Sequence, residues 1–282
     1  MQASRSVPGA RTVTEKNVGI NCSNLALLAE YARRRNLGRM LTYGRLLNTL
    51  SPSDRRKIAH GWGVPGSTLE ERNTENLFAS LGTEIVASLD ISDIDGADIL
   101  ADLMDDFAAN AAMGPYLGTF DTVLDYGTSE HVFNFPQALV NAYNLLRPDG
   151  AYIFDLPVSG WVSHAVYQFS PSYFMALGAS PWFELEWLFF HRKHGDRLFH
   201  IRHYNNVSYS RINGSKRISA WGVLKKVVPA GSSGPLTLNR LRAMQVDPRQ
   251  YNRVKKPSLV SRLRSVRSYS ARTVPAMFER ND

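Results

Sequence analysis

Short apolar runs alternate with helical patterns between residues 24 and 156. Helices are predicted over 24–35, 51–60, 69–81 and 135–146, and strands over 40–43, 84–89, 120–124 and 151–156. Strands that alternate with helices of this length pair in parallel, and the helices cover both faces of the sheet. The pattern therefore predicts an α/β fold.

The pattern changes after Pro157. Residues 184–190, 198–207 and 218–228 are rich in aromatic and β-branched residues, and Gly-Asp and Asn-Gly pairs separate them, which favours antiparallel hairpins. Residues 231–235 (GSSGP) are typical of a linker. We predict a loose leader over 1–23, a folded domain over 24–230 and a flexible basic tail over 231–282.

The positive charge is concentrated in the last part of the chain. The net charge is +8, from 33 Lys and Arg against 25 Asp and Glu, and residues 239–282 hold 11 of the former and 3 of the latter. The body is therefore neutral, which argues against a nucleic-acid-binding core. The tail permits weak contact with phosphate or an anionic membrane surface. Residues 260–267 could form a short basic amphipathic helix there, and a solvated tail is the alternative.

Composition also limits the class of protein. The single cysteine, Cys22, cannot form an internal disulfide, and no apolar run reaches the roughly 18 residues of a membrane-spanning helix. The first residues lack the apolar stretch of a secretory signal. The expected location is the cytoplasm, and the sequence indicates no oligomeric state.

Ligands of parallel α/β sheets bind beyond the carboxyl ends of the strands. Asp90 follows the second parallel strand, where a carboxylate can accept hydrogen bonds from ribose hydroxyls. The alternative is an aspartate in a solvated turn.

Three segments then resemble one family. Residues 120–150 (FDTVLDYGTSEHVFNFPQALVNAYNLLRPDG) resemble the fourth-strand region of class I S-adenosylmethionine-dependent methyltransferases, with Asp149 in place of a turn glycine. Residues 88–103 (SLDISDIDGADILADL) resemble the second strand with its ribose-binding acid and the adenine-binding region. Residues 164–171 (HAVYQFSP) are similar to a run found in a bacterial branch of the same family.

The resemblance implies a Rossmann-like, mostly parallel sheet that ends in an antiparallel C-terminal strand, and it implies S-adenosylmethionine as cofactor. The implied cofactor-binding residues are Thr42, Tyr43 and Gly44 beside the methionine end, Asp90 and Ile91 at the ribose, Asp102 and Leu103 near adenine, and Tyr126 and Gly127. The implied residues on the acceptor side are Glu130, His131 and His164 as catalytic groups, with Tyr167 and Gln168 in the substrate-binding wall.

His131 could serve as a general base on a hydroxyl or amine, because imidazole titrates near neutral pH. Alternatively, the Glu-His pair only braces the next helix. The expected reaction is methyl transfer to oxygen, nitrogen or carbon of a small-molecule or glycan acceptor. A catalytically inactive binding protein of the same fold is the main alternative, and a protein that acts on nucleic acid is a weaker one.

The chain departs from the family in its first loop. Gly44 is the only glycine after the first strand of the resemblance, where the family usually has three, so Tyr43 and Arg45 could crowd the cofactor. The gap from Gly44 to Asp90 is also long for one βαβ unit, and the helix predicted over 51–60 would account for it.

Other chemistries find less support. The pairs His191-x-x-His194 and His200-x-x-His203 suggest a metal site, but residues three apart in a strand point to opposite faces, so we predict no metal. Residues 127–131 lack the glycine that a hydrolase nucleophile turn needs, because His131 occupies its position. The chain also has no phosphate-binding loop of the ATPase type.

Overall fold

The computed structural model describes residues 19–192, 197–201, 217–242 and 266–270. The first half contains β1 (Gly19–Ile20), α1 (Cys22–Ala32), β2 (Gly38–Tyr43), β3 (Leu47–Asn48), α2 (Pro52–Trp62), α3 (Gly66–Glu70), α4 (Glu75–Ser80), β4 (Thr83–Asp90) and β5 (Ile99–Leu100). The second half contains β6 (Phe120–Asp125), α5 (Phe135–Leu145), β7 (Leu146–Ser159), α6 (Pro171–Gly178), β8 (Phe183–Arg192), β9 (Arg197–Ile201), β10 (Ile218–Lys226), α8 (Leu238–Arg242) and β11 (Val266–Ser270). Two 3₁₀ helices, Ala111–Tyr116 and Ser129–His131, flank β6.

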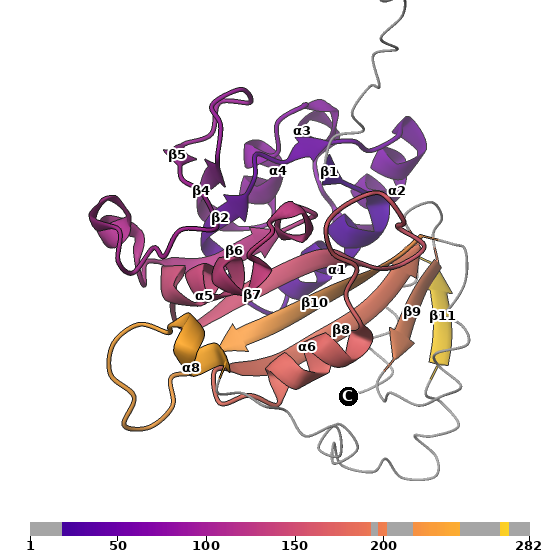
Figure 1. Ribbon diagram of the computed structural model, residues 1–282. Coiled ribbons are helices and arrows are strands. Elements are labelled where there is room, and N and C mark those ends of the chain that lie inside the picture. Colours follow the sequence, from indigo (N-terminus) through magenta and orange to yellow (C-terminus); the bar gives the residue numbers. More distant parts are fainter. Residues whose placement is uncertain (1–18, 193–196, 202–216, 243–265, 271–282) are drawn as a thin grey trace, which may run out of the picture.

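Most strands form one central sheet (Figure 1), and β1 and β3 pair in a separate two-stranded sheet. Within the described residues, nine strands lie side by side in the order β5-β4-β2-β6-β7-β10-β8-β9-β11. The neighbours from β5 to β7 are parallel, and β10 is antiparallel to both β7 and β8. This arrangement confirms the predicted α/β class with a mostly parallel sheet and an antiparallel late strand.

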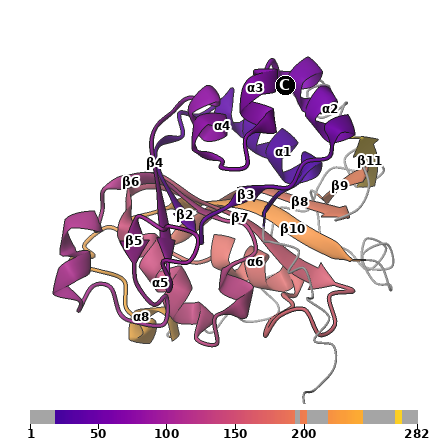
Figure 2. The ribbon, with the colours of Figure 1, turned by 90° about the horizontal axis from the view of Figure 1, so that it is seen from above.

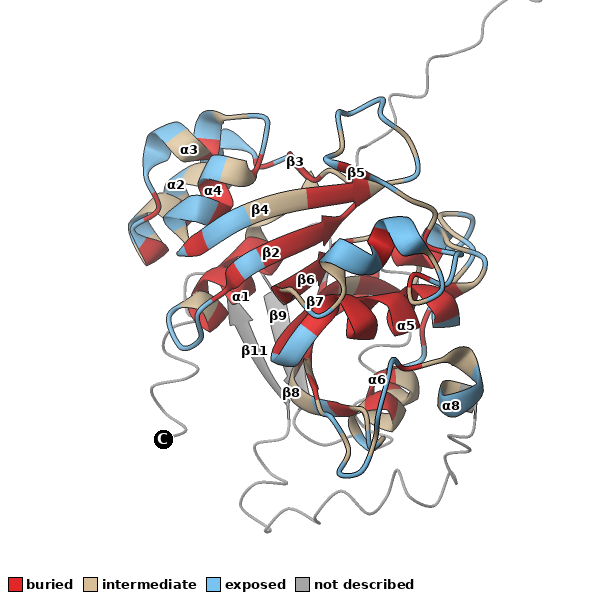
Figure 3. Cartoon of the chain, turned by 90° about the vertical axis from the view of Figure 1, so that its left-hand side faces the viewer, coloured by how far each residue is buried: buried red, intermediate tan, exposed pale blue. Residues whose placement is uncertain are grey.

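Helices cover both faces of the sheet, as the alternating pattern predicts. Figure 2 shows α1 to α4 on one side and α5, α6 and α8 on the other. Each side has its own apolar core: Met40, Leu124 and Trp221 belong to the first, and Val123 and Phe154 to the second. In the burial view, β2 and β6 lie in the covered middle of the sheet (Figure 3). Their carboxyl ends are therefore fixed by packing on two sides.

Helix boundaries follow capping chemistry. Ser51 caps α2 with Pro52 in its first turn, and Gly63 ends that helix with a φ of 68°, close to the predicted limits. α1 begins at Cys22, two residues before the predicted start at residue 24, and its cap is Asn21. Its side chain accepts hydrogen bonds from the backbone N–H groups of Ser23 and Asn24.

The helix predicted over 69–81 is interrupted. It consists of α3 and α4, with an extended residue, Glu71, between them. The Asn48 side chain donates hydrogen bonds to the carbonyls of Leu69 and Glu71, and the Asn48 backbone N–H donates to Arg72. These contacts stabilise the interruption between α3 and α4. The stretch from β3 to α4 fills the long gap between Gly44 and Asp90.

β7 begins before the predicted strand. The predicted turn at 147–150 is part of its irregular first half, where the register against β6 shifts. Asp149 has a φ of 63°, in the left-handed region that glycine adopts most readily. Its carboxylate lies 2.9 Å from the Lys225 ammonium on β10.

The first residues of the predicted tail pack against the body. Leu236 is fully buried, and its backbone N–H and carbonyl form two hydrogen bonds of 2.9 Å with the Asn144 side chain at the end of α5. Val266 and Arg267, assigned to a possible helix, lie in β11 instead. Residues 1–18, 243–265 and 271–282 lie outside the described residues, so the division into leader, domain and tail stays a prediction. Among the described residues, no helix is long and apolar enough to span a membrane.

Candidate active site

Three turns meet at the carboxyl edge of the sheet. Gly44 follows β2, Asp90 ends β4, and Thr128 lies in the turn after β6. Gly44 has a φ of 72°, and a Cβ atom there would lie 2.8 Å from Thr128 Oγ1 and 3.7 Å from Asp90 Oδ2. The strand order changes direction here: β4 lies on one side of β2, and β6 lies on the other. Ligands of open α/β sheets bind at such a point.

A cavity of about 320 Å³ opens at this edge. That volume is within the range of small-molecule sites, and its walls combine apolar side chains with a few polar groups. Its lining is Leu89, Asp90, Ile91, Ala101, Asp102, Leu103, Met104, Thr128, His131, Val132 and Phe133. Five residues selected from the sequence, Asp90, Ile91, Asp102, Leu103 and His131, are thus brought together around one cavity.

Asp90 is half-buried and borders this cavity. Its Oδ1 accepts a hydrogen bond from the Ser92 backbone N–H at 3.2 Å. Asp102 Oδ1 likewise accepts one from the Met104 backbone at 2.8 Å. Both carboxylates are held by their own turns, so each keeps further lone pairs for a ligand.

Asp125, the last residue of β6, was missed in the sequence analysis. Its fully buried carboxylate accepts hydrogen bonds from the backbone N–H groups of Thr128 and Ser129, from the Ser129 hydroxyl, and from the Tyr152 hydroxyl at 2.6 Å. Burial raises the pKa of the Asp125 carboxyl, and the hydrogen bonds act in the opposite direction. Asp125 therefore fixes the turn that carries Gly127, Glu130 and His131. An aspartate followed by Thr and Ser three and four residues later could have indicated it.

The three residues predicted as catalytic lie together. His131 Nε2 is 4.0 Å and His164 Nε2 is 3.9 Å from Glu130 Oε1. Glu130 is buried, whereas the His131 side chain is 43% exposed. Partial burial lowers the pKa of the His131 imidazole, against the opposing charge of Asp125. The two imidazole rings meet edge to face, 5.2 Å apart.

A second, smaller cavity of about 50 Å³ lies on the other side of this cluster. Its lining includes Gly127, Glu130, Asp155, His164 and His191. The sequence analysis did not identify the pair within it: His191 Nε2 lies 2.7 Å from Asp155 Oδ1. Asp155 Oδ2 accepts a hydrogen bond from the Asn24 side chain at 3.0 Å. His191 thus forms a hydrogen bond with Asp155, and His194 and His203 lie outside the described residues.

Two other residues predicted to bind the cofactor, Thr42 and Tyr43, form hydrogen bonds within the protein. The Thr42 hydroxyl donates to the Gly44 carbonyl at 2.8 Å, and the Tyr43 hydroxyl donates to the Ala138 carbonyl at 3.0 Å. Tyr43 is fully buried, which raises its pKa well above the usual value, so its side chain belongs to the core and does not crowd the cavity. Tyr126 is also buried, although it contributes to the wall of the smaller cavity.

The predicted substrate residues brace the loop after β7. The Tyr167 hydroxyl donates to the Phe133 carbonyl at 2.7 Å, and the Tyr167 backbone N–H donates to the Glu130 carbonyl at 3.1 Å. Gln168 Oε1 accepts a hydrogen bond from the Trp161 backbone at 2.8 Å. Neither side chain lines the two cavities described above. Their contacts instead hold His164 and Glu130 near each other.

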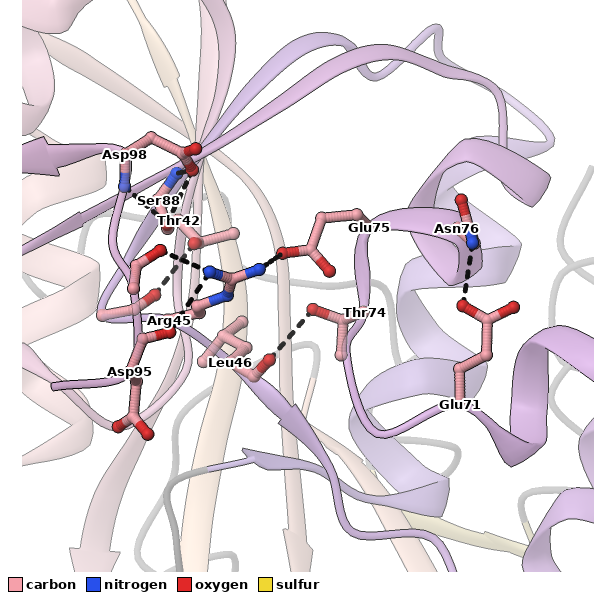
Figure 4. Close-up of polar contacts among 12 residues, drawn as sticks. Thr42, Arg45, Leu46, Glu71, Thr74, Glu75, Asn76, Ser88, Asp95 and Asp98 are labelled. Atoms are coloured by element: carbon pink, nitrogen blue, oxygen red, sulfur yellow. Dashed lines mark hydrogen bonds and ion pairs between the residues drawn. The ribbon is translucent and has the colours of Figure 1, made fainter. Parts of the chain in front are cut away.

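Arg45 binds the loop over 91–98 (Figure 4). Its guanidinium donates to the carbonyls of Asp95 and Gly96, and it forms a 2.8 Å ion pair with Glu75 on α4. The Asp98 carboxylate closes the same loop by accepting two 2.8 Å hydrogen bonds from Ser88. The possible crowding by Arg45 therefore does not occur, because the side chain is directed to the loop over 91–98.

Solved structures similar to this chain include three named methyltransferases. A 1,6-didemethyltoxoflavin-N1-methyltransferase from Burkholderia thailandensis, solved with its substrate and S-adenosylhomocysteine, is 13% identical with a TM-score of 0.41, over 76% of this chain and 80% of its own. The N-methyltransferase NodS from Bradyrhizobium japonicum is 9% identical with a TM-score of 0.42, over 73% and 94%. A TehB-like methyltransferase from Corynebacterium glutamicum is 14% identical with a TM-score of 0.39, over 76% and 90%. No family model and no curated protein match the chain.

Replacing Arg45 with methionine should loosen the loop over 91–98. Methionine keeps much of the apolar stem but removes the donors to Asp95 and Gly96 and the ion pair to Glu75. Amide hydrogen exchange measured by mass spectrometry should become faster in residues 91–98 and stay the same in β6. The exposed Arg56→Met in α2 is a matched control. Equal protection of the loop in both variants would show that Arg45 does not hold it.

Proposed function

We propose that this chain binds S-adenosylmethionine in the larger cavity and transfers its methyl group to a small-molecule acceptor on the side of the smaller cavity. The observation that carries the proposal is the position of Asp90. It ends β4 beside the point where the strand order reverses, and it borders a cavity with otherwise mainly apolar walls. An acid in this place is suited to the two hydroxyls of a ribose.

The residues around the cavity fit an adenosyl group. Ile91, Leu103 and Val132 offer apolar surface for a base, and Asp102 offers acceptors at its edge. Gly44 lets the turn after β2 approach Thr128 and Asp90 closely, because a Cβ atom there would lie only 2.8 Å from Thr128 Oγ1. When bound, S-adenosylmethionine supplies an electrophilic methyl group on a positively charged sulfur.

The chain's own groups would orient the acceptor. His131 borders the larger cavity, while Glu130 and His164 border the smaller one, so the cluster stands between them. The smaller cavity, at about 50 Å³, has room for only one end of an acceptor, and its lining includes the carboxylates of Glu130 and Asp155 and two imidazoles. Such a lining favours an acceptor that presents a hydroxyl or amine group there, such as a metabolite or a glycan. Holding the acceptor in line with the methyl group accounts for much of the rate that such a site can provide.

Calorimetric titration with S-adenosylhomocysteine tests the proposal. We expect one site per chain with micromolar affinity, weaker binding of adenosine, and no binding of homocysteine alone. Because the sugar hydroxyls are the proposed partners of Asp90, 2′-deoxyadenosine should bind more weakly than adenosine. Absence of heat at millimolar S-adenosylhomocysteine would refute the proposal.

One observation favours a catalytically inactive binding protein of the same fold. The Thr128 hydroxyl donates to the Tyr43 carbonyl at 2.6 Å, which places a side chain against the only glycine of the first loop. Failure of wild-type protein to bind S-adenosylhomocysteine, with binding restored in Thr128→Gly, would support this alternative.

A further inference from the structure

Glu130, His131 and His164 offer a donor set that the sequence spacing conceals. One ligand atom from each of these residues lies within 4.8 Å of the others. Both Nε2 atoms are about equally far from Glu130 Oε1, at 4.0 Å for His131 and 3.9 Å for His164. A pattern search along the chain would miss this set, because His164 comes from a different loop.

We propose that these three side chains bind one divalent transition-metal ion of the zinc type. Zinc bonds to imidazole nitrogen and carboxylate oxygen are about 2.0–2.2 Å long, so ligands on one ion lie roughly 3.3–3.5 Å apart in a tetrahedron. The two separations from Glu130 Oε1 exceed this by less than about 1 Å, and the ligand atoms of His131 and His164 lie within 4.8 Å of each other. Rotation of the partly exposed His131 ring can close the difference. Two imidazoles and one carboxylate, with a position left open, form a donor set typical of catalytic zinc.

The backbone around the cluster is held in place before any ion binds. The Glu130 carbonyl accepts a hydrogen bond from the Tyr167 backbone N–H at 3.1 Å, which ties the two segments together. The His164 backbone N–H donates to the Trp161 carbonyl at 3.1 Å, and the two side-chain rings pack with centroids 4.7 Å apart. Asp125 fixes the turn that ends in Glu130 and His131. Such support from neighbouring groups is what precise metal geometry requires.

Metal binding does not depend on the proposed function, whereas the catalytic role of the ion rests on that function. Glu130 and His164 line the smaller cavity, so an additional ligand of the ion would lie there. If the chain transfers methyl groups, this ligand is an acceptor hydroxyl, whose pKa the ion would lower.

The test uses full-length protein without a histidine tag, dialysed first against chelator and then against chelator-free buffer. Calorimetry with zinc chloride should give one site with at least micromolar affinity. Cobalt(II) should give visible absorption of a four- or five-coordinate ion. Glu130→Gln and His164→Ala should each weaken zinc binding at least about 100-fold, in line with loss of one of three ligands. His60→Ala, an exposed histidine in α2, is the control and should bind as the wild type does.

Unchanged zinc affinity in His164→Ala, or no zinc binding by the wild type, would overturn the proposal. Circular dichroism checks that each variant is folded. Should Glu130→Gln unfold, His131→Ala replaces it, because that ring is largely at the surface and its loss should weaken zinc binding without unfolding the chain. Zinc binding without S-adenosylhomocysteine binding would leave the metal site standing and refute the proposed function. Binding of S-adenosylhomocysteine without zinc binding would refute the metal site and leave the proposed function standing.

Discussion

Asp90→Ala is expected to weaken S-adenosylhomocysteine binding about 10- to 100-fold, because hydrogen bonds to a charged group contribute roughly 1.5–3 kcal/mol. Asp90→Asn should lose less, since an amide oxygen can still accept one ribose hydroxyl. The loop itself should stay closed in both variants, because Arg45 and the Ser88–Asp98 contacts hold it independently. Calorimetry and thermal shift with added ligand measure the effect.

Asp93→Ala is the matched control for this prediction. Asp93 is an exposed carboxylate in the same loop, and its removal changes the net charge by the same amount. The affinity of Asp93→Ala for S-adenosylhomocysteine should remain within about twofold of that of the wild type, because surface charges contribute little to binding. If Asp90→Ala and Asp93→Ala bind equally well, the carboxylate of Asp90 does not hold the ligand, and the larger cavity is not an adenosyl site.

Asp125→Ala should produce the largest loss of stability. It removes the common acceptor of Thr128, Ser129 and Tyr152 in a fully buried place, and each donor left without a partner costs about 1–3 kcal/mol. Part of this cost will be recovered by relaxation and water, so we expect a decrease of about 4 kcal/mol in the free energy of unfolding. Urea unfolding followed by tryptophan fluorescence measures it.

Variants that each remove one hydrogen-bond donor to Asp125 give the scale for this loss of stability. Tyr152→Phe removes one hydrogen bond to Asp125 and keeps the ring, so a decrease of about 1 kcal/mol is expected. Ser129→Ala should behave similarly. A decrease in Asp125→Ala no larger than in Tyr152→Phe would mean that the turn after β6 does not depend on the aspartate.

The fold could be predicted because its main signal is local. Runs such as residues 120–124 and the helix over 135–145 carry their period in the residues themselves, and the structure has both. The break at Glu71 could not be foreseen, because it depends on Asn48, which reaches the carbonyls from a separate strand. The cap of α1 at Asn21 was missed for a simpler reason: Asn21, Ser23 and Asn24 can each cap a helix, and the local sequence does not decide among them.

The candidate site likewise contains residues that the local sequence could predict and residues that it could not. Asp90 ends β4 and His131 lies in the short 3₁₀ helix after β6, so topology brings both to one edge of the sheet. Asp155 and His191 were missed as a pair, because their contact spans β10 and depends on the register of three strands. Arg45 was misjudged, since the direction of a long side chain is set by acceptors 50 residues away.

The position of β10 has a consequence for biosynthesis. β10 separates β7 from β8 and forms the ladders on both sides, yet it is made after both of them. Until residues 218–226 have emerged from the ribosome, that half of the molecule has no continuous sheet. The contact between Asp155 and His191 must therefore assemble in the last phase of folding, and a nascent chain that stalls before residue 218 would expose two unpaired strand edges to chaperones and proteases.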